Sequence, residues 1–181
     1  MDNKALFYTA IATAGTWAAV LCAFLIVWLQ TRAAKRLASL QLFIQLAAQY
    51  DSDSMQRIRA RLAAKLLSDA SSVDLEDSLM VFYENLAILT RRRLLDLDLV
   101  SNTFSFDVRC YWIALRHCVA QSRTEFSDPT LFEEFEQLND YFLRSKYSPM
   151  GTRLGQVAIT PETAQHFLRY EALRGGSIER A

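Results

Sequence analysis

The sequence predicts an all-α protein, an N-terminal transmembrane helix that continues into a cytoplasmic bundle of about four to five helices. Residues 5–29 contain no Asp, Glu, Lys, Arg or His, and a helix of that length crosses a hydrocarbon core of roughly 30 Å. Elsewhere glycine and proline are scarce, and apolar residues recur at helical spacing. We therefore divide the chain into an N-terminal segment with the membrane helix (1–31), a cytoplasmic bundle (32–148) and a C-terminal extension with a short helix (149–181).

The charged flanks of the apolar run predict its orientation. A cleaved signal peptide would begin with a basic region and have a shorter apolar stretch, whereas here Asp2 offsets Lys4 and the run is long. Arg32, Lys35 and Arg36 follow the run directly, and such cations stay on the cytoplasmic side. We expect an uncleaved, single-pass anchor in the bacterial inner membrane, with the N-terminus outside and the C-terminal domain in the cytoplasm.

One face of the predicted membrane helix carries small and hydroxylated residues. At 100° per residue, this face holds Thr9, Ala12, Thr13, Thr16, Ala19 and Ala23. Small residues let helix backbones approach closely, and hydroxyls can bond across helices, so the face predicts self-association. A ring of such helices would present Thr9, Thr13 and Thr16 to a water-filled lumen. The alternative is that these hydroxyls only bond a carbonyl one turn back.

Caps and apolar periods place the cytoplasmic helices. We expect the anchor to run on to about Tyr50, and Asp51–Ser54 to begin a second helix whose outer face carries Arg57, Arg59, Arg61 and Lys65. The remaining predicted helices run from 73 to 95, from Ser101 or Thr103 to about Arg123, from Asp128-Pro129 onward, and from Thr160-Pro161 to Gly175-Gly176.

Charge is balanced in total but unevenly distributed. The chain has 20 Lys+Arg and 20 Asp+Glu, so no basic excess favours nucleic acid. Cations gather in residues 32–67 and acids in 68–90. The helix faces could pair within the bundle or between subunits, or Arg32, Lys35 and Arg36 could form a basic collar on anionic lipid headgroups, at about 1 kcal/mol per cation. The sequence leaves these alternatives open.

Patterns that carry catalysis or bind metals are missing from the sequence. His117 and His166 have no partner at the spacing of a metal site or a triad, and Cys110 and Cys118 lie too far apart for paired zinc ligands. No phosphate-binding loop is present. We therefore expect a non-enzymatic protein without cofactor or metal.

The sequence contains one dense basic run away from the predicted membrane segment. Arg91, Arg92 and Arg93 could complement the C-terminal dipole of their helix. They could alternatively contact an anion or RNA.

Several short motifs of aromatic, acidic and apolar residues recur at helical spacing: Phe82-Tyr83-Glu84-Asn85, Leu94-Leu95-Asp96, Asp98-Leu99-Val100, Phe104, Tyr111-Trp112, Arg123 and Phe135-Glu136-Gln137-Leu138. With these motifs the chain resembles a bacterial family of single-pass membrane proteins with a helical cytoplasmic domain, catalogued as a domain of unknown function. The resemblance covers residues 5–142, and it implies that Glu84, Tyr111, Trp112 and Arg123 form a polar-aromatic cluster joining helices. A glutamate–arginine contact would hold the bundle in register.

The architecture is also similar, more loosely, to membrane accessory proteins of RNA-targeting CRISPR systems, which implies an oligomeric pore in antiviral defence. Two functions follow. The first is a membrane protein whose cytoplasmic domain drives homo-oligomerisation or binds a protein partner, forming a pore or effector in bacterial defence. The second is a membrane-tethered RNA-binding or degenerate nuclease-like domain, based on the arginine run and the basic second helix.

Overall fold

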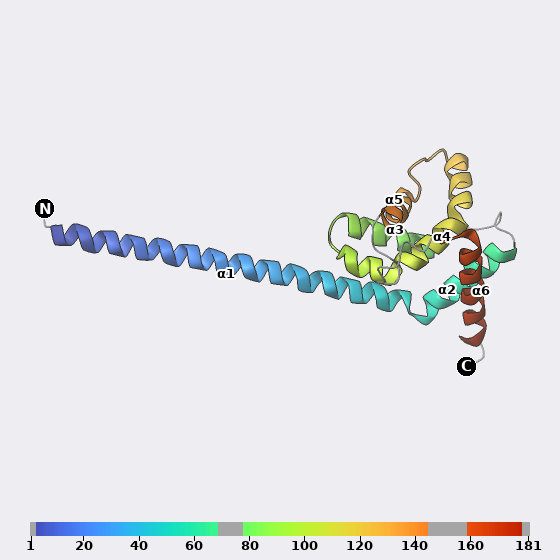
Figure 1. Ribbon diagram of the computed structural model, residues 1–181, viewed down its shortest axis with the longest axis horizontal. Coiled ribbons are helices and arrows are strands. Elements are labelled where there is room, and N and C mark those ends of the chain that lie inside the picture. Colours follow the sequence, from blue (N-terminus) through green and yellow to red (C-terminus); the bar gives the residue numbers. More distant parts are fainter. Residues whose placement is uncertain (1–2, 69–77, 145–158, 179–181) are drawn as a thin grey trace. The chain divides into compact units, whose positions relative to one another are not determined.

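The computed structural model describes residues 3–68, 78–144 and 159–178, and over these ranges the chain is entirely helical apart from its connections (Figure 1). The helices are α1 (Asn3–Tyr50), α2 (Asp53–Ser68), α3 (Ser78–Arg91), α4 (Leu97–Glu125), α5 (Glu133–Arg144) and α6 (Pro161–Ile178). The prediction of an all-α fold is confirmed. The chain forms two compact units, Met1–Gln41 and Leu42–Ala181, which we describe separately.

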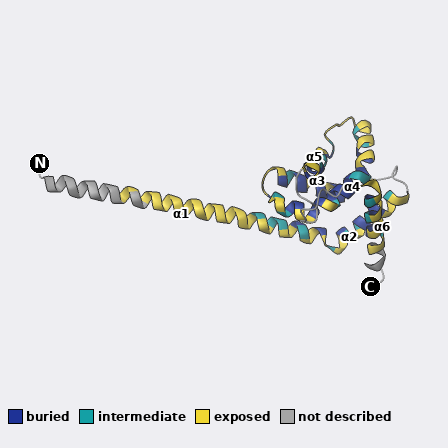
Figure 2. Cartoon of the chain, in the orientation of Figure 1, coloured by how far each residue is buried: buried dark blue, intermediate teal, exposed yellow. Residues whose placement is uncertain are grey.

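The first unit contains most of α1, which runs to Tyr50 as predicted. Every large apolar side chain described between Val20 and Leu29 is 49–73% exposed, and Figure 2 colours most of the described part of this helix as exposed. The Arg32 guanidinium lies over the Trp28 ring, 5.3 Å from its centroid. The Thr31 hydroxyl donates to the Val27 carbonyl at 2.8 Å.

The predicted membrane segment lies only partly within the residues that the structure describes. The side chains of residues 5–15, 18 and 19, and with them Thr9, Ala12, Thr13 and Ala19, lie outside the described residues, whereas Thr16 and Ala23 are described and exposed. Over the part of the chain that the structure describes, no helix has the length and apolarity needed to span a bilayer.

The second unit is a helical bundle with an aromatic core. Tyr50, in the last turn of α1, packs between Phe82 of α3 and Phe104 of α4, with ring centroids 5.3 and 5.2 Å away. Tyr83 stacks on Phe135 of α5 at 5.0 Å. Because aromatic side chains bury the largest apolar areas, this cluster joins α1, α3, α4 and α5 into one core.

Local chemistry explains where α2 begins. The Ser52 hydroxyl accepts a hydrogen bond from the backbone N–H of Met55 at 3.3 Å, which is the N-cap predicted from the Asp51–Ser54 segment. Met55 and Leu62 are buried on the inner face of α2, as the apolar period predicts.

The predicted end of the third helix at residue 95 is wrong, because α3 ends at Arg91. Arg93 adopts a positive φ of 57°. The N–H of Arg93 donates to the Thr90 carbonyl at 2.9 Å, and the N–H of Leu94 donates to the Leu89 carbonyl at 3.0 Å. This pair of bonds is a Schellman motif, which closes a helix with a left-handed residue, usually glycine. The predicted start at residue 73 lies outside the described residues.

The predicted start of the next helix at Ser101 or Thr103 is also wrong, because α4 begins at Leu97. Asp96 is itself the N-cap of α4, and its carboxylate accepts from the N–H groups of Asp98 and Leu99 at 2.9 and 3.4 Å. Because aspartate is as good a cap as serine or threonine, α4 is about one turn longer at its N-terminus than predicted.

The Asp128-Pro129 pair begins a turn rather than a helix. The Asp128 carboxylate accepts from the N–H and hydroxyl of Thr130 at 2.9 and 2.7 Å. Phe132 then adopts a φ of 55°, so the helical path is interrupted and α5 begins at Glu133.

The C-terminal helix is longer than predicted and packs into the bundle. It begins at Pro161, with the Thr163 N–H donating to the Thr160 hydroxyl at 3.3 Å, but it runs past Gly175-Gly176 to Ile178, because glycine permits a helix end without enforcing one. Helix α6 lies against α2 and α4 and buries Leu168. The C-terminal segment therefore completes the core of the second unit.

Candidate functional site

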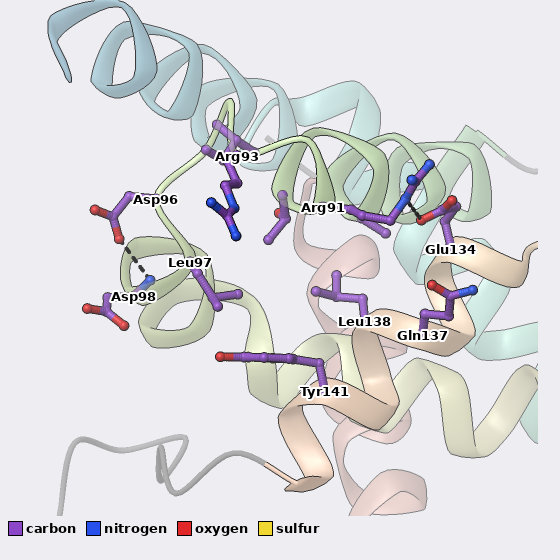
Figure 3. A pocket seen from close by; sticks show the side chains of 12 residues that line it. Arg91, Arg93, Asp96, Leu97, Asp98, Glu134, Gln137, Leu138 and Tyr141 are labelled. Carbon is purple, nitrogen blue, oxygen red and sulfur yellow. Dashed lines mark hydrogen bonds and ion pairs between the residues drawn. The ribbon is translucent and has the colours of Figure 1, made fainter. Parts of the chain in front are cut away.

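The arginine run predicted as an anion or RNA contact borders a pocket of about 500 Å³, shown in Figure 3. The pocket lies between the α3–α4 connection and α5, and buried Ala87, Leu95 and Leu138 form its apolar wall. Arg93 points toward the pocket from above, and the Tyr141 ring lies opposite.

The charges around this pocket do not favour a polyanion. The Arg91 Nε lies 2.7 Å from the Glu134 Oε2, so this guanidinium already has an acidic partner. Asp96 and Asp98 also line the pocket (Figure 3), so three carboxylates face two guanidinium groups. Arg92 is exposed and is not among the lining residues. The structure therefore does not bring the three arginines together on one ligand.

Three residues of the predicted polar-aromatic cluster, Glu84, Trp112 and Arg123, lie around the start of α5. The Glu84 carboxylate, on α3, accepts from the backbone N–H of Glu134 at 3.3 Å and from that of Phe135 at 2.8 Å. It caps α5 from a different helix, and a carboxylate there also complements the helix dipole. Partial burial raises the pKa of Glu84, and the two backbone hydrogen bonds offset part of that rise.

Arg123 holds the same segment from the α4 side. Its Nε donates to the Leu131 carbonyl at 2.9 Å, and its Nη1 donates to the Glu136 carboxylate at 2.8 Å. Glu84 and Arg123 thus act on neighbouring parts of the chain, residues 131–136, each through its own partners. Trp112 packs edge-on against the Phe135 ring at 5.2 Å.

Tyr111 belongs to a different group of buried polar side chains, which the sequence interpretation missed. This group, which we call the buried polar cluster, consists of Tyr50, Arg59, Tyr83, Asp107, Tyr111 and Glu171. It draws side chains from α1, α2, α3, α4 and α6.

The expectation that Arg59 lies on an outer face of α2 is wrong. Arg59 is 2% exposed, because α6 covers this side of α2. Its Nε lies 3.2 Å from the Glu171 Oε2, although this contact lacks hydrogen-bond geometry. Its guanidinium carbon lies 4.0 Å from the Tyr50 ring centroid. The sequence held a clue, since Arg59 comes four residues after Met55 and three before Leu62, on the apolar stripe.

Hydrogen bonds connect the rest of the buried polar cluster. The Tyr50 hydroxyl donates to the Asp107 Oδ2 at 2.5 Å and lies 3.0 Å from the Tyr83 hydroxyl. The Tyr111 hydroxyl donates to the Glu171 Oε2 at 3.5 Å. Burial is the main cause that raises the pKa values of Asp107 and Glu171, and Arg59 opposes the rise in both.

Nucleophilic or metal chemistry finds no support among the described side chains. Burial raises the pKa of the Cys110 thiol to about 12, which keeps it protonated and unreactive at neutral pH. Within residues that the structure describes, no three His, Cys, Asp or Glu side chains are grouped to hold a metal ion.

The comparisons with known proteins agree with the predicted family of unknown function. No curated protein and no solved structure matches the chain. A family model, described as a domain of unknown function (DUF4760), matches residues 9–142, which include Glu84 and Arg123 and all of the buried polar cluster except Glu171. This chain therefore belongs to the DUF4760 family.

Proposed function

We propose that this protein is a non-enzymatic, single-pass protein of the bacterial inner membrane, in which α1 both anchors a cytoplasmic helical bundle and joins it to further copies of the chain. The observation that carries the proposal is a repeat of uncharged positions along α1. Spaced alternately three and four residues apart, they are Thr9, Ala12, Thr16, Ala19, Ala23, Ile26, Gln30, Ala33, Leu37 and Leu40. We call these positions the α1 seam.

The spacing of the α1 seam is that of a coiled coil. An average of 3.5 residues per repeat keeps one stripe of a helix facing a partner helix with the same repeat. The described seam positions are exposed, including the large side chains of Ile26, Leu37 and Leu40. Arg32, Lys35 and Arg36 all fall outside the seam, so pairing does not bury a charge.

Residue size along the seam changes where the proposed membrane segment ends. Before residue 26 the seam holds only Thr and Ala, and after Arg32 it holds Ala33, Leu37 and Leu40. Within lipid, helices associate by close backbone approach over small residues. In water, association instead requires the burial of large apolar side chains. One seam thus suits both environments in turn.

The partner that best fits the seam is a second copy of the chain. Anchors inserted in the same orientation lie parallel, so the Thr/Ala part of one copy meets the Thr/Ala part of the next. Gln30 is a polar seam position between the Thr/Ala part and the part with Ala33, Leu37 and Leu40. A single amide side chain in such a seam specifies the register of the paired helices. Exposed apolar side chains between Val20 and Leu29 also support contact with lipid.

The number of copies separates two forms of this proposal. In a dimer, the two seams pack against each other and no lumen forms. In a ring of more copies, the hydroxyls of Thr9, Thr13 and Thr16 face a lumen, and this is the form that could act as a pore in bacterial defence. Measuring the mass of the full chain in detergent by light scattering decides between them.

Substitutions on and beside the seam test the proposal. We expect Leu37→Asp to convert the oligomer to a monomer, because it places a charge in the apolar contact. Ala38→Asp introduces the same charge at an exposed position off the seam and is expected to leave the mass unchanged. A wild-type monomer, or equal effects of the two variants, would contradict assembly through α1. Release of the protein from membranes by alkaline carbonate would contradict the anchor.

A further inference from the structure

A second pocket, of about 380 Å³, opens beside the buried polar cluster. It lies wholly within the second unit, where the end of α1, the start of α4 and helix α6 contribute its walls. Its volume falls in the range of about 300–1,000 Å³ that is typical of small-molecule sites.

Acidic groups outnumber basic groups in this pocket. Its charged lining consists of Asp51, Asp107 and Glu171 together with Arg59 and Arg174. Arg59 is committed to Glu171, at 3.2 Å, with both side chains 5% exposed or less. The other charged lining residues are Asp51, Asp107 and Arg174, so the lining as a whole has one more carboxylate than guanidinium groups and carries a net negative charge.

Asp107 is the carboxylate best placed to hold a ligand. Its Oδ2 accepts the Tyr50 hydroxyl, which fixes the orientation of the carboxylate and leaves Oδ1 as the acceptor for a bound group. Its side chain is half-buried and lines the pocket directly. A charge in such surroundings is poorly solvated, so a cation bound beside it would replace the missing solvation.

Aromatic rings form the rest of the wall. Phe106 and Phe167 meet edge to face at 5.6 Å, and Phe104 and Tyr170 also line the pocket. Phe106 and Tyr170 are exposed large side chains, and the Arg174 guanidinium lies over the Tyr170 ring, 5.9 Å from its centroid. Aromatic faces attract organic cations through the ring quadrupole, and the same rings cover the apolar body of a ligand.

We propose that this pocket binds an organic cation, a protonated amine or quaternary ammonium group carried on an apolar or aromatic body. The ammonium group lies at Asp107, and the apolar body lies against Phe106 and Phe167. The net negative charge excludes an anionic ligand of the same shape. Aromatic walls and the lack of three grouped ligand side chains among the described residues disfavour a metal ion.

Three matched compounds test the proposal on the full chain in detergent. Phenethylamine, 2-phenylethanol and 3-phenylpropionate share a phenyl ring and differ in charge. We expect phenethylamine alone to raise the unfolding temperature saturably, by a few degrees (about 2–8 °C) at concentrations well above its Kd. Equal shifts from all three compounds would overturn the proposal. So would the absence of any shift at about 10 mM phenethylamine, a concentration high enough to detect a weak ligand.

Variants locate the binding site. We expect Asp107→Asn to weaken phenethylamine binding by calorimetry at least about tenfold, because it removes the charge that the ammonium group meets. Phe106→Ala, at an exposed position, is expected to weaken binding about fivefold with unchanged circular dichroism, which keeps the test valid if Asp107→Asn does not fold. Asp98→Asn, in the other pocket, is the matched control, and an equal loss of binding in this variant would overturn the assignment.

Discussion

The hydroxyl of Tyr50 lies 2.5 Å from the Oδ2 of Asp107, and this bond joins the last turn of α1 to the middle of the bundle. The Tyr50 ring packs against Phe82 and Phe104, and the Arg59 guanidinium lies over its face. One side chain therefore combines apolar packing, a hydrogen bond to a carboxylate and a cation–π contact.

Replacing Tyr50 by Phe keeps the ring and removes the hydroxyl. The Asp107 carboxylate then loses its donor in a half-buried site, so we expect the free energy of unfolding to fall by about 1–3 kcal/mol. Urea denaturation followed by circular dichroism measures the change. Tyr170→Phe, at an exposed ring, is the control, and an equal loss in both variants would contradict a special role for Tyr50.

Arg59 and Arg61 are neighbouring arginines on α2 with different surroundings. Arg59→Ala leaves the buried Glu171 without its counter-charge, so we expect a loss of about 3–5 kcal/mol of unfolding free energy. Arg61→Ala, at an exposed position, should change stability by less than about 0.5 kcal/mol.

A double variant separates the ion pair from the packing. Arg59→Met combined with Glu171→Leu removes both charges and keeps the side-chain volume, so it should be more stable than Arg59→Ala. If Arg59→Ala proves as stable as the wild-type protein in urea, the buried ion pair has no part in holding α6 against α2.

Stability should depend on pH through Asp107. Because burial raises the pKa of this carboxyl in the folded state, the folded protein retains a proton at pH values where the unfolded chain, with a pKa of about 3.9, has lost it. The contribution of Asp107 to stability is therefore highest at low pH and declines as pH rises from about 4 through the folded pKa.

Asp107→Asn lacks this titration and isolates its effect. We expect the stability of the wild-type protein relative to the variant to fall as pH rises across that window, measured by urea denaturation at a series of pH values. A relative stability that rises with pH would show that the carboxylate is favoured in its charged form.

Glu84 caps α5 from α3, and its removal should loosen that helix. Glu84→Ala leaves the N–H groups of Glu134 and Phe135 without their acceptor, at an expected cost of about 1 kcal/mol. Glu84→Gln keeps an acceptor oxygen and should recover part of the loss. Hydrogen exchange at these two amides is the direct readout, with the exposed Asn85→Ala as control. Unchanged protection in Glu84→Ala would refute the cap.

Helix ends that depend on residues close together in the sequence were predictable. The end of α1 at Tyr50, the Ser52 cap and the start of α6 after Thr160 depend on local caps and on the apolar period, which any short stretch displays. The errors at Arg93 and Asp96 have a local cause as well. An arginine in a left-handed conformation is uncommon, so Arg93 gives no helix-end signal in the sequence. Asp96 follows three residues later and caps α4, so the connection between the two helices is residues 92–96.

The sequence by itself determined that the chain is helical and that residues 5–29 contain no charged side chain. It also determined that uncharged residues recur every three or four positions along α1. Only the tertiary structure decided that Arg59 is buried against Glu171, that Tyr50 meets Asp107, and that Glu84 caps another helix. The physical reason is that a cap or an apolar stripe depends on neighbours in the chain. The partner of a buried charge instead depends on which helix covers it, and no local pattern records that.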